Sequence, residues 1–191
     1  HETGFCTQHW QALVAANMAQ PLALITHTYL QHTLKSLTDP LEAMAKSKQP
    51  RKSRAQIKEF SRMVKKHEHD CLICTDMHTR LDRYTATIAT LYRDDADFRT
   101  EFSTGKGLCL HHSEKAILMA QRILDGAWVT RFSACIAEVL HANLKRLEDD
   151  VWWMTQKYKS EHRDAPWNGC EDAHKRLGRK LIGDARIVCD S

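Results

Sequence analysis

The chain has 191 residues, of which 42% are hydrophobic and 27% charged, and its formal net charge is +4. This composition is typical of a soluble globular protein with one domain, or one and a half, and the mild positive charge does not by itself indicate a nucleic-acid partner. Seven cysteines, an odd number in a chain of this size, favour reduced thiols in a cytoplasmic protein over a secreted disulfide framework. No apolar run is long enough to cross a membrane, and no signal peptide is recognisable.

The first motif of the chain is a cysteine and a histidine separated by two residues, Cys6 and His9, preceded by Gly4. A helix is expected after His9, with a break at Pro21. Two ligands do not close a tetrahedral metal site, so we treat Cys6 and His9 as a second half-site. We predict that their partners lie upstream of His1, with Cys170 and His174, one helical turn apart, as the alternative.

The next stretch, residues 39–54, is predicted to be a connector with a short helix over residues 41–45. It contains five basic residues within positions 46–54. We interpret it as a solvated linker, and the alternative is a patch for an anionic partner. A helix through Ile57, Phe60 and Val64 then leads to the central motif of the chain.

That motif is a C-x-x-C pair, Cys71 and Cys74, followed by a C-x-x-H pair, Cys109 and His112. Three thiols and an imidazole are the ligand set of a tetrahedral Cys₃His site. Two ligands separated by two residues can face one ion when the backbone turns between them, as it does at a helix start. We therefore predict that these four residues bind one zinc ion, with Asp70 as the N-cap of the helix that carries Cys74.

Three other interpretations of these cysteines are open. They could hold an iron–sulfur cluster, act as a redox-active dithiol, or pack as small hydrophobic residues. The neighbouring His67 and His69 could also be ligands, but we interpret them as surface groups, because Cys109 and His112 already complete four.

The second half of the chain shows helical periodicity. A stripe of Leu81, Ile88 and Leu91 predicts one helix, and residues 127–158 predict a long amphipathic one. Between them, Gly105-Lys106-Gly107 is interpreted as a turn, since a G-x-G without a preceding strand is weak support for phosphate binding. A last helix is expected over residues 170–181, and Cys189 in the tail is predicted to be a free thiol.

The two halves share a pattern. The G-Φ-C-x-x-H motif (Φ, hydrophobic) occurs at residues 4–9 and 107–112, each time followed by similar helices, which indicates an internal duplication. We predict an all-α helical bundle built from this duplicated unit. Its parts are half of a first repeat (1–45), a basic connector and lead-in helix (46–66), a second repeat with the metal clip (67–160), and a C-terminal helix and tail (161–191).

The paired motifs resemble those of an uncharacterised bacterial family of all-helical proteins with a repeated C-P-x-C…G-F-C-x-x-H unit, a domain of unknown function. The resemblance implies that Cys71, Cys74, Cys109 and His112 form one unit's motif and that Cys6 and His9 end another. The chain departs from the family pattern at Leu72, where proline is common, and it lacks the first unit's C-x-x-C. The family has no settled activity, so the resemblance implies a fold and a site rather than a function.

We therefore expect a structural zinc site in a helical interaction or regulatory module that binds a protein partner or itself. The alternatives are an iron–sulfur or thiol-based redox sensor and a nucleic-acid-binding module that uses the basic connector. The sequence contains no H-E-x-x-H, nucleophile elbow or suitably placed acidic pair, which weighs against a hydrolytic metalloenzyme.

Overall fold

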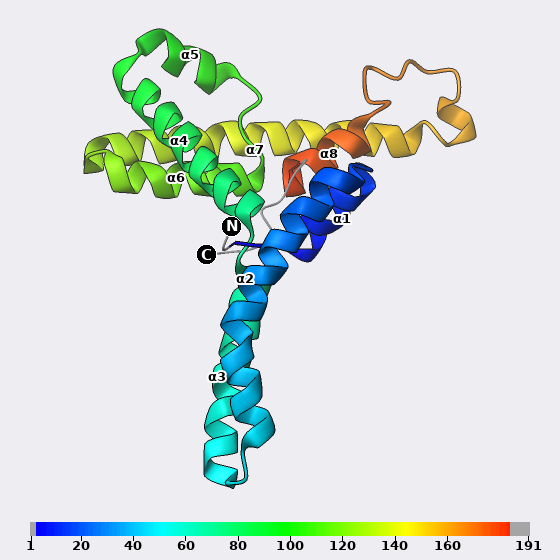
Figure 1. The fold of residues 1–191 in the computed structure, drawn as a ribbon. Coiled ribbons are helices and arrows are strands. Elements are labelled where there is room, and N and C mark those ends of the chain that lie inside the picture. Colours follow the sequence, from blue (N-terminus) through cyan, green and yellow to red (C-terminus); the bar gives the residue numbers. More distant parts are fainter. Residues whose placement is uncertain (1–2, 184–191) are drawn as a thin grey trace. The chain divides into compact units, whose positions relative to one another are not determined.

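A computed structural model describes residues 3–183, and Figure 1 shows them as helices joined by loops. The prediction of an all-α fold is confirmed, because no β-strand occurs in this range. No helix among the described residues has both the length and the apolar character to cross a membrane. The elements are α1 (Thr7–Ala15), α2 (Ala19–Lys46), α3 (Pro50–His69), α4 (Leu72–Asp94), α5 (Ala96–Thr104), α6 (Leu110–Ile123), α7 (Gly126–Gln156), the short 3₁₀ helix η1 (Ser160–His162) and α8 (Ala173–Ile182).

The chain divides into two compact units, with the boundary between Thr79 and Arg80. Unit 1 contains α1, α2, α3 and the first residues of α4. Unit 2 contains the rest of α4 and the helices from α5 to α8. The boundary therefore falls inside a helix rather than in a loop.

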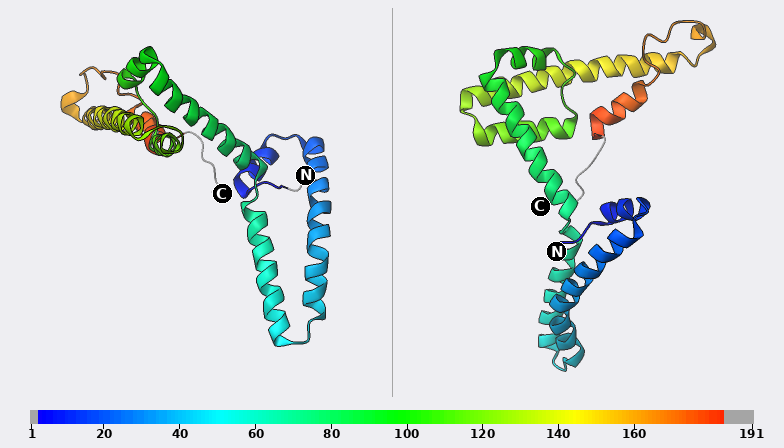
Figure 2. Two further views of the ribbon diagram at one scale, coloured as in Figure 1. Left: turned by 90° about the vertical axis from the view of Figure 1, so that its left-hand side faces the viewer. Right: turned by 45° about the horizontal axis from the view of Figure 1, so that its top comes forward.

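In unit 1, α2 and α3 form an antiparallel hairpin joined by residues 47–49, as Figures 1 and 2 show. The predicted connector over residues 39–54 is wrong in this respect, since α2 continues through Pro40 to Lys46 and α3 begins at Pro50. Proline removes a single backbone hydrogen bond at position 40, and the helix continues on both sides of it. Pro21 lies in the first turn of α2, where a missing N–H is tolerated.

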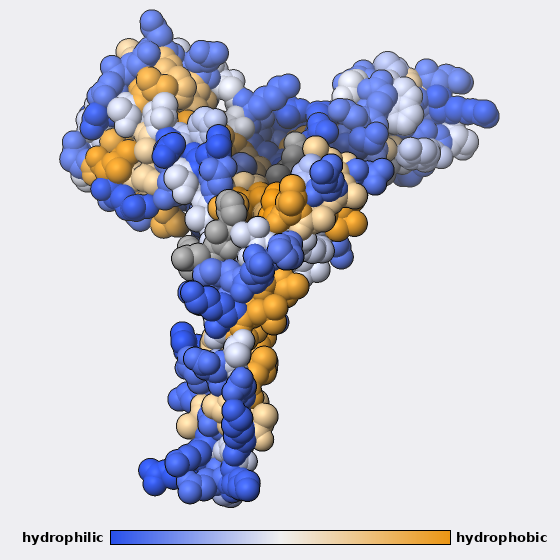
Figure 3. Space-filling model, viewed as in Figure 1, coloured by the Kyte–Doolittle hydropathy of each residue, from blue (hydrophilic) through white to orange (hydrophobic). Residues whose placement is uncertain are grey.

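This hairpin buries very little. No residue of α1, α2 or α3 is buried, and the buried residues in the range 3–79 are Gly4, Cys6, Cys71 and Cys74. Figure 3 shows hydrophobic surface running along the hairpin beside strongly hydrophilic surface. Within residues 3–79, the buried cluster therefore consists of Cys6, Cys71 and Cys74, with the partly buried Phe5 and Ile73 packed against it, which is much smaller than the core of an ordinary domain.

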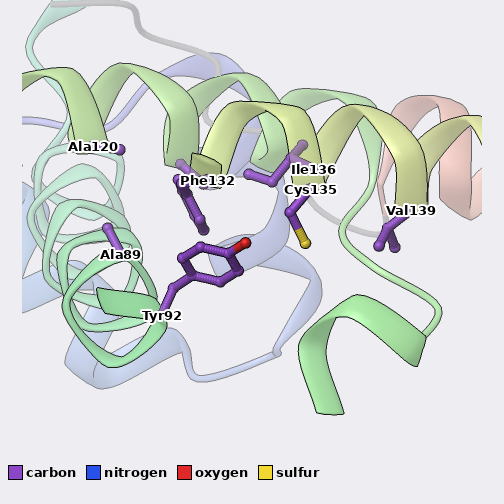
Figure 4. Close-up of a cluster of buried hydrophobic side chains, with 8 residues drawn as sticks. Ala89, Tyr92, Ala120, Phe132, Cys135, Ile136 and Val139 are labelled. Atoms are coloured by element: carbon purple, nitrogen blue, oxygen red, sulfur yellow. The ribbon is translucent and has the colours of Figure 1, made fainter. Parts of the chain in front are cut away.

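Unit 2, in contrast, has a core. Figure 4 shows Tyr92 of α4 against Phe132 and Cys135 of α7, and the Tyr92 and Phe132 ring centroids are 5.0 Å apart. Phe98 and Phe102 of α5 pack against the same cluster. Burial and the neighbouring Cys135 thiol raise the pKa of Tyr92 to about 12, because a phenolate would lose hydration here.

The helix ends of unit 2 follow local sequence signals. Asp95 caps α5 by accepting hydrogen bonds from two backbone N–H groups, and Asp125 caps α7 in the same way. The long helix predicted over residues 127–158 is α7. Asp70, however, is the residue that ends α3, so its predicted role as the N-cap of the next helix is wrong.

Candidate metal centre

Four potential metal ligands meet in unit 1: Cys6, His9, Cys71 and Cys74. Their ligand atoms all lie within 4.8 Å of one another. The three cysteines are buried and His9 is half-buried. This is a Cys₃His set, the combination that the sequence predicts, but with a different pair of residues completing Cys71 and Cys74.

The distances within the cluster match those around a tetrahedral zinc ion. The Nδ1 atom of His9 lies 3.3 Å from the Sγ atom of Cys6 and 3.4 Å from those of Cys71 and Cys74. The Sγ atoms of Cys6 and Cys74 are 3.9 Å apart. Zinc bonds of about 2.3 Å to sulfur and about 2.0 Å to nitrogen imply about 3.8 Å between sulfurs and about 3.5 Å between sulfur and nitrogen. The four side chains thus surround a space of the size that one such ion fills.

Each ligand pair is positioned by the start of a helix. Cys6 is the N-cap of α1 and His9 is its third residue. Cys71 directly precedes α4, and its carbonyl accepts a hydrogen bond from the Thr75 N–H at 2.9 Å. Cys74 is the third residue of α4. An N-cap residue and the third helical residue face the same side of the first turn, which is why an x-x spacing brings both ligands to one ion.

The helix starts also suit negatively charged ligands. The free N–H groups of a helix's first turn carry partial positive charge, which attracts negatively charged ligand atoms. The Cys74 N–H lies 3.5 Å from the Cys71 sulfur, so a backbone donor is directed at a ligand atom. Three thiolates holding a dication would leave a net charge of about −1 in the cluster, and two helix N-termini face it.

Backbone contact holds the two pairs together. The segment before α1 runs parallel to the segment before α4, with a bridge between Gly4 and Cys71. The Leu72 N–H donates to the Gly4 carbonyl at 3.0 Å. The α2–α3 hairpin makes this contact geometrically accessible, because α2 leads the chain away from Cys6 and α3 brings it back.

At this contact there is little space for a side chain at position 4. A Cβ atom at Gly4 would lie 2.5 Å from the Tyr29 ring of α2, which is closer than real side-chain contacts. The Tyr29 hydroxyl in turn shares a hydrogen bond of 2.8 Å with Nδ1 of His67 in α3. The loop that carries Cys6 thus packs directly on the hairpin, and His67 stabilises the hairpin rather than joining the cluster.

Cys109 and His112 belong to unit 2 and are not members of this cluster. The sequence predicts them as the partners of Cys71 and Cys74, whereas the structure brings Cys71 and Cys74 together with Cys6 and His9 within unit 1. They do have the same local geometry as the first pair, since Cys109 is the N-cap of α6 and its sulfur lies 3.4 Å from the His112 Nδ1. Burial and the adjacent His111 lower the pKa of His112. Metal binding by this pair stays a prediction.

Cys6 and His9 were predicted to have partners upstream of His1, but Cys71 and Cys74 already bring the group to four potential ligands within the chain. The alternative pair does not join the cluster either. Cys170 is buried before α8, and burial raises the pKa of its thiol. His69 is exposed, as expected for a surface group. Cys189 lies outside the described residues.

The missed signal was present in the sequence. The G-F-C-x-x-H motif at residues 4–9 is followed by a C-x-x-C after two long helical patterns, and an antiparallel pair of helices brings its two ends together. Cys109 and His112 were chosen as partners instead, because only 34 residues separate Cys74 from Cys109.

A closed shell of four protein ligands leaves no position for a substrate, so the arrangement suits a structural ion.

Comparison with known proteins adds one match. A family model described as a family of unknown function (DUF6062) matches residues 1–187. No curated protein and no solved structure matches the chain.

Proposed function

The chain belongs to this family of unknown function, and we propose that it is a metal-stabilised protein-interaction module in which a structural zinc ion organises unit 1. The observation that carries the proposal is the content of the unit's interior. Its buried residues, within positions 3–79, are Gly4 and the three cysteine ligands. A unit that cannot bury enough apolar surface needs another source of folding free energy, and a structural metal supplies it.

The zinc assignment rests on the donor set. Three thiolates and one imidazole suit a borderline-soft ion in tetrahedral geometry, and the interatomic distances agree with zinc. An iron–sulfur cluster also uses thiolates, but its several metal atoms need more widely separated sulfurs than a single ion does. All four ligand atoms lie within 4.8 Å of one another, which favours a single ion.

We propose that the ion, by stabilising unit 1, holds the α2–α3 hairpin in place as a binding surface. Leu30, Leu34 and Leu41 are four and seven residues apart, so they share one face of α2, and they are 54%, 55% and 44% exposed. An uncovered row of leucines on a helix is typical of a protein-docking face. The adjoining α3 has seven lysine and arginine residues against two glutamates, so we propose a partner with an acidic surface rather than a second copy of this chain.

The metal assignment is tested by metal analysis of protein purified without a metal-binding tag or added zinc. We expect one zinc per chain in the wild type, almost none in Cys6→Ser and Cys74→Ser, and one in Cys109→Ser. The last variant is the matched control, since it removes a cysteine of equal local geometry from unit 2. Loss of the zinc in Cys109→Ser, or its retention in Cys6→Ser, would refute the assignment. A visible absorption spectrum separates zinc, which is colourless, from an iron–sulfur cluster.

The docking face is tested by analytical ultracentrifugation and by affinity capture with quantitative mass spectrometry. We expect a monomer, and an acidic protein whose capture is lost both in Leu34→Ser and in Cys74→Ser. Leu34 is exposed, so its replacement leaves folding intact. A concentration-dependent dimer that Leu34→Ser abolishes would show that the face binds a second copy instead.

The basic face of α3 supports one competing function, nucleic-acid binding. Phosphate contacts release counterions, so such binding weakens steeply as salt increases. Fluorescence anisotropy with random-sequence RNA and DNA over a salt series measures this directly. Tight binding with a steep salt slope, lost on replacing Arg54 and Lys58 together, would favour this function over protein docking.

A further inference from the structure

Unit 2 contains a surface pocket of about 330 Å³ that is separate from the metal centre. Five of its lining residues are cationic, and none is acidic: Lys106, Arg146, Arg176, Arg179 and Lys180. Such a concentration of positive charge around one cavity is costly unless anions compensate it. The pocket is formed by the loop before α6 together with α7 and α8.

Part of this charge is compensated within the protein. Asp150 accepts hydrogen bonds from both Arg146 and Arg176 at 2.9 Å, and Arg176 also pairs with Asp172 at 2.7 Å. These contacts hold the two guanidinium groups in place at the pocket. The carboxylates that do so do not line it, so the cavity itself stays positive.

Lys180 is the decisive residue. It is only 9% exposed, and within residues 3–183 its ammonium group forms no ion pair with a carboxylate. Its hydrogen bond goes to the Lys106 carbonyl at 2.6 Å. A buried ammonium group normally has an anionic partner, because removing its hydration is costly.

The electrostatics of Lys180 agree with a role in binding an anion. Burial lowers its pKa, Cys109 opposes this shift, and the nearby Arg146 adds to it. An anion in the cavity would remove that penalty by compensating both cations. Lys106, whose side chain is exposed at the same pocket, also has no carboxylate partner in the described part of the chain.

The loop beside the pocket is held in one conformation. Asn143 of α7 donates to the Gly105 carbonyl at 3.2 Å, and Lys180 binds the next carbonyl, that of Lys106. Gly107 has a positive φ of 62°, and a Cβ there would lie 2.7 Å from Val139 and 3.6 Å from the Lys180 Nζ. Glycine at this position therefore lets the loop approach the lysine closely, and the cavity is preorganised.

From these observations we infer that the pocket binds a small phosphate-bearing anion through Lys106, Lys180 and the two arginines fixed by Asp150. Guanidinium groups provide paired N–H donors for phosphate oxygens, and ammonium groups add charge. The cavity lies at the lower end of the size range of ligand pockets, which suits a small phosphorylated molecule rather than a polymer. The Gly105-Lys106-Gly107 turn thus lies beside an anion site formed by side chains of other helices.

The test is isothermal titration calorimetry of the full chain with inorganic pyrophosphate at constant ionic strength, in the wild type and three variants. We expect saturable one-to-one binding, weakened about tenfold or more in Lys106→Ala and in Lys180→Met, since each removes one charge-assisted hydrogen bond. Lys159→Ala removes the same charge from an exposed position outside the pocket and should bind as the wild type does.

Lys106→Ala keeps the backbone carbonyl that Lys180 binds and changes an exposed side chain only, so it tests the pocket even if Lys180→Met disturbs folding. Absence of saturable binding to the wild type would overturn the inference. So would equal affinity in the wild type and Lys106→Ala, or equal weakening in Lys159→Ala. Metal content is measured on the same samples, so failure here is distinguishable from failure of the zinc assignment.

Discussion

Unit 1 buries Gly4 and three cysteine ligands, whereas unit 2 buries a cluster that includes Tyr92, Phe132 and Ile136 from two long helices. Both units are helical, and both contain a G-Φ-C-x-x-H motif at the start of a helix. On the proposed function they differ in what stabilises the packing: metal coordination by the Cys₃His cluster in unit 1 and burial of apolar surface in unit 2. Similar local motifs can therefore belong to units with different sources of stability.

The largest effect should come from removing the metal. A strong chelator should unfold unit 1 and leave unit 2 folded, because structural zinc in small peptides contributes about 10–16 kcal/mol of apparent folding free energy. Hydrogen exchange followed by mass spectrometry should show α1, α2 and α3 exchanging freely while α6 and α7 stay protected. The Cys109→Ser protein should respond in the same way. Equal deprotection of both units would contradict the comparison.

Acid should have a similar but graded effect, because protons compete with the metal for thiolates and imidazole. Loss of the metal at low pH should therefore unfold unit 1 and leave unit 2 folded, as the chelator does. Zinc content and exchange protection of α1 should fall together as the pH is lowered. Protection of α7 should persist over the range in which the zinc is lost.

A smaller effect is expected from Gly4→Ala. The added methyl group would meet the Tyr29 ring at 2.5 Å, and overpacking of this kind costs about 1–3 kcal/mol. Because the same loop holds Cys6, zinc affinity should fall by about tenfold or more, as measured by competition with a chromophoric chelator. Gly126→Ala is the matched control, since no atom lies within 4 Å of a Cβ at that position. Unchanged affinity in Gly4→Ala would show that this contact does not position the ligand.

The smallest effect concerns the core of unit 2 at alkaline pH. The pKa of Tyr92 is raised to about 12, above its value of about 10 in an unfolded chain. The stability that this shift reports is fully present below pH of about 10 and is lost as the pH rises towards about 12. The denaturation midpoint of unit 2 should therefore fall over this interval. Tyr92→Phe should reduce the fall, and Tyr84→Phe, at an exposed position, should not.

Much of the fold was predictable because helix signals are local. The periodicity of residues 127–158 predicted α7, and Asp125 caps it as aspartate before a helix usually does. The hairpin was not predicted, since Pro40 and the charged residues after it favoured a connector. Packing of α3 along α2 overrides these weak local preferences, and periodicity alone does not report such packing.

The ligands of the metal centre were individually predictable and their combination was not. Cys6, His9, Cys71 and Cys74 were all singled out by the x-x spacing. That spacing describes one helix start, with an N-cap ligand and a second ligand three residues further on, and it contains no information about which other helix start lies nearby. Distance along the chain was therefore the available guide, and it selected Cys109 and His112.

By itself, the sequence determined the helical class, the helix starts and the spacing of the two ligands in each pair, because each depends on residues within one or two turns. The tertiary structure decided which pairs meet. The α2–α3 hairpin returns the chain to its start, and the hydrogen bond from the Leu72 N–H to the Gly4 carbonyl joins the two segments. It also decided that Lys106 and Lys180, 74 residues apart, share one pocket. Contacts between distant segments depend on how whole helices pack, and no short stretch of sequence contains that information.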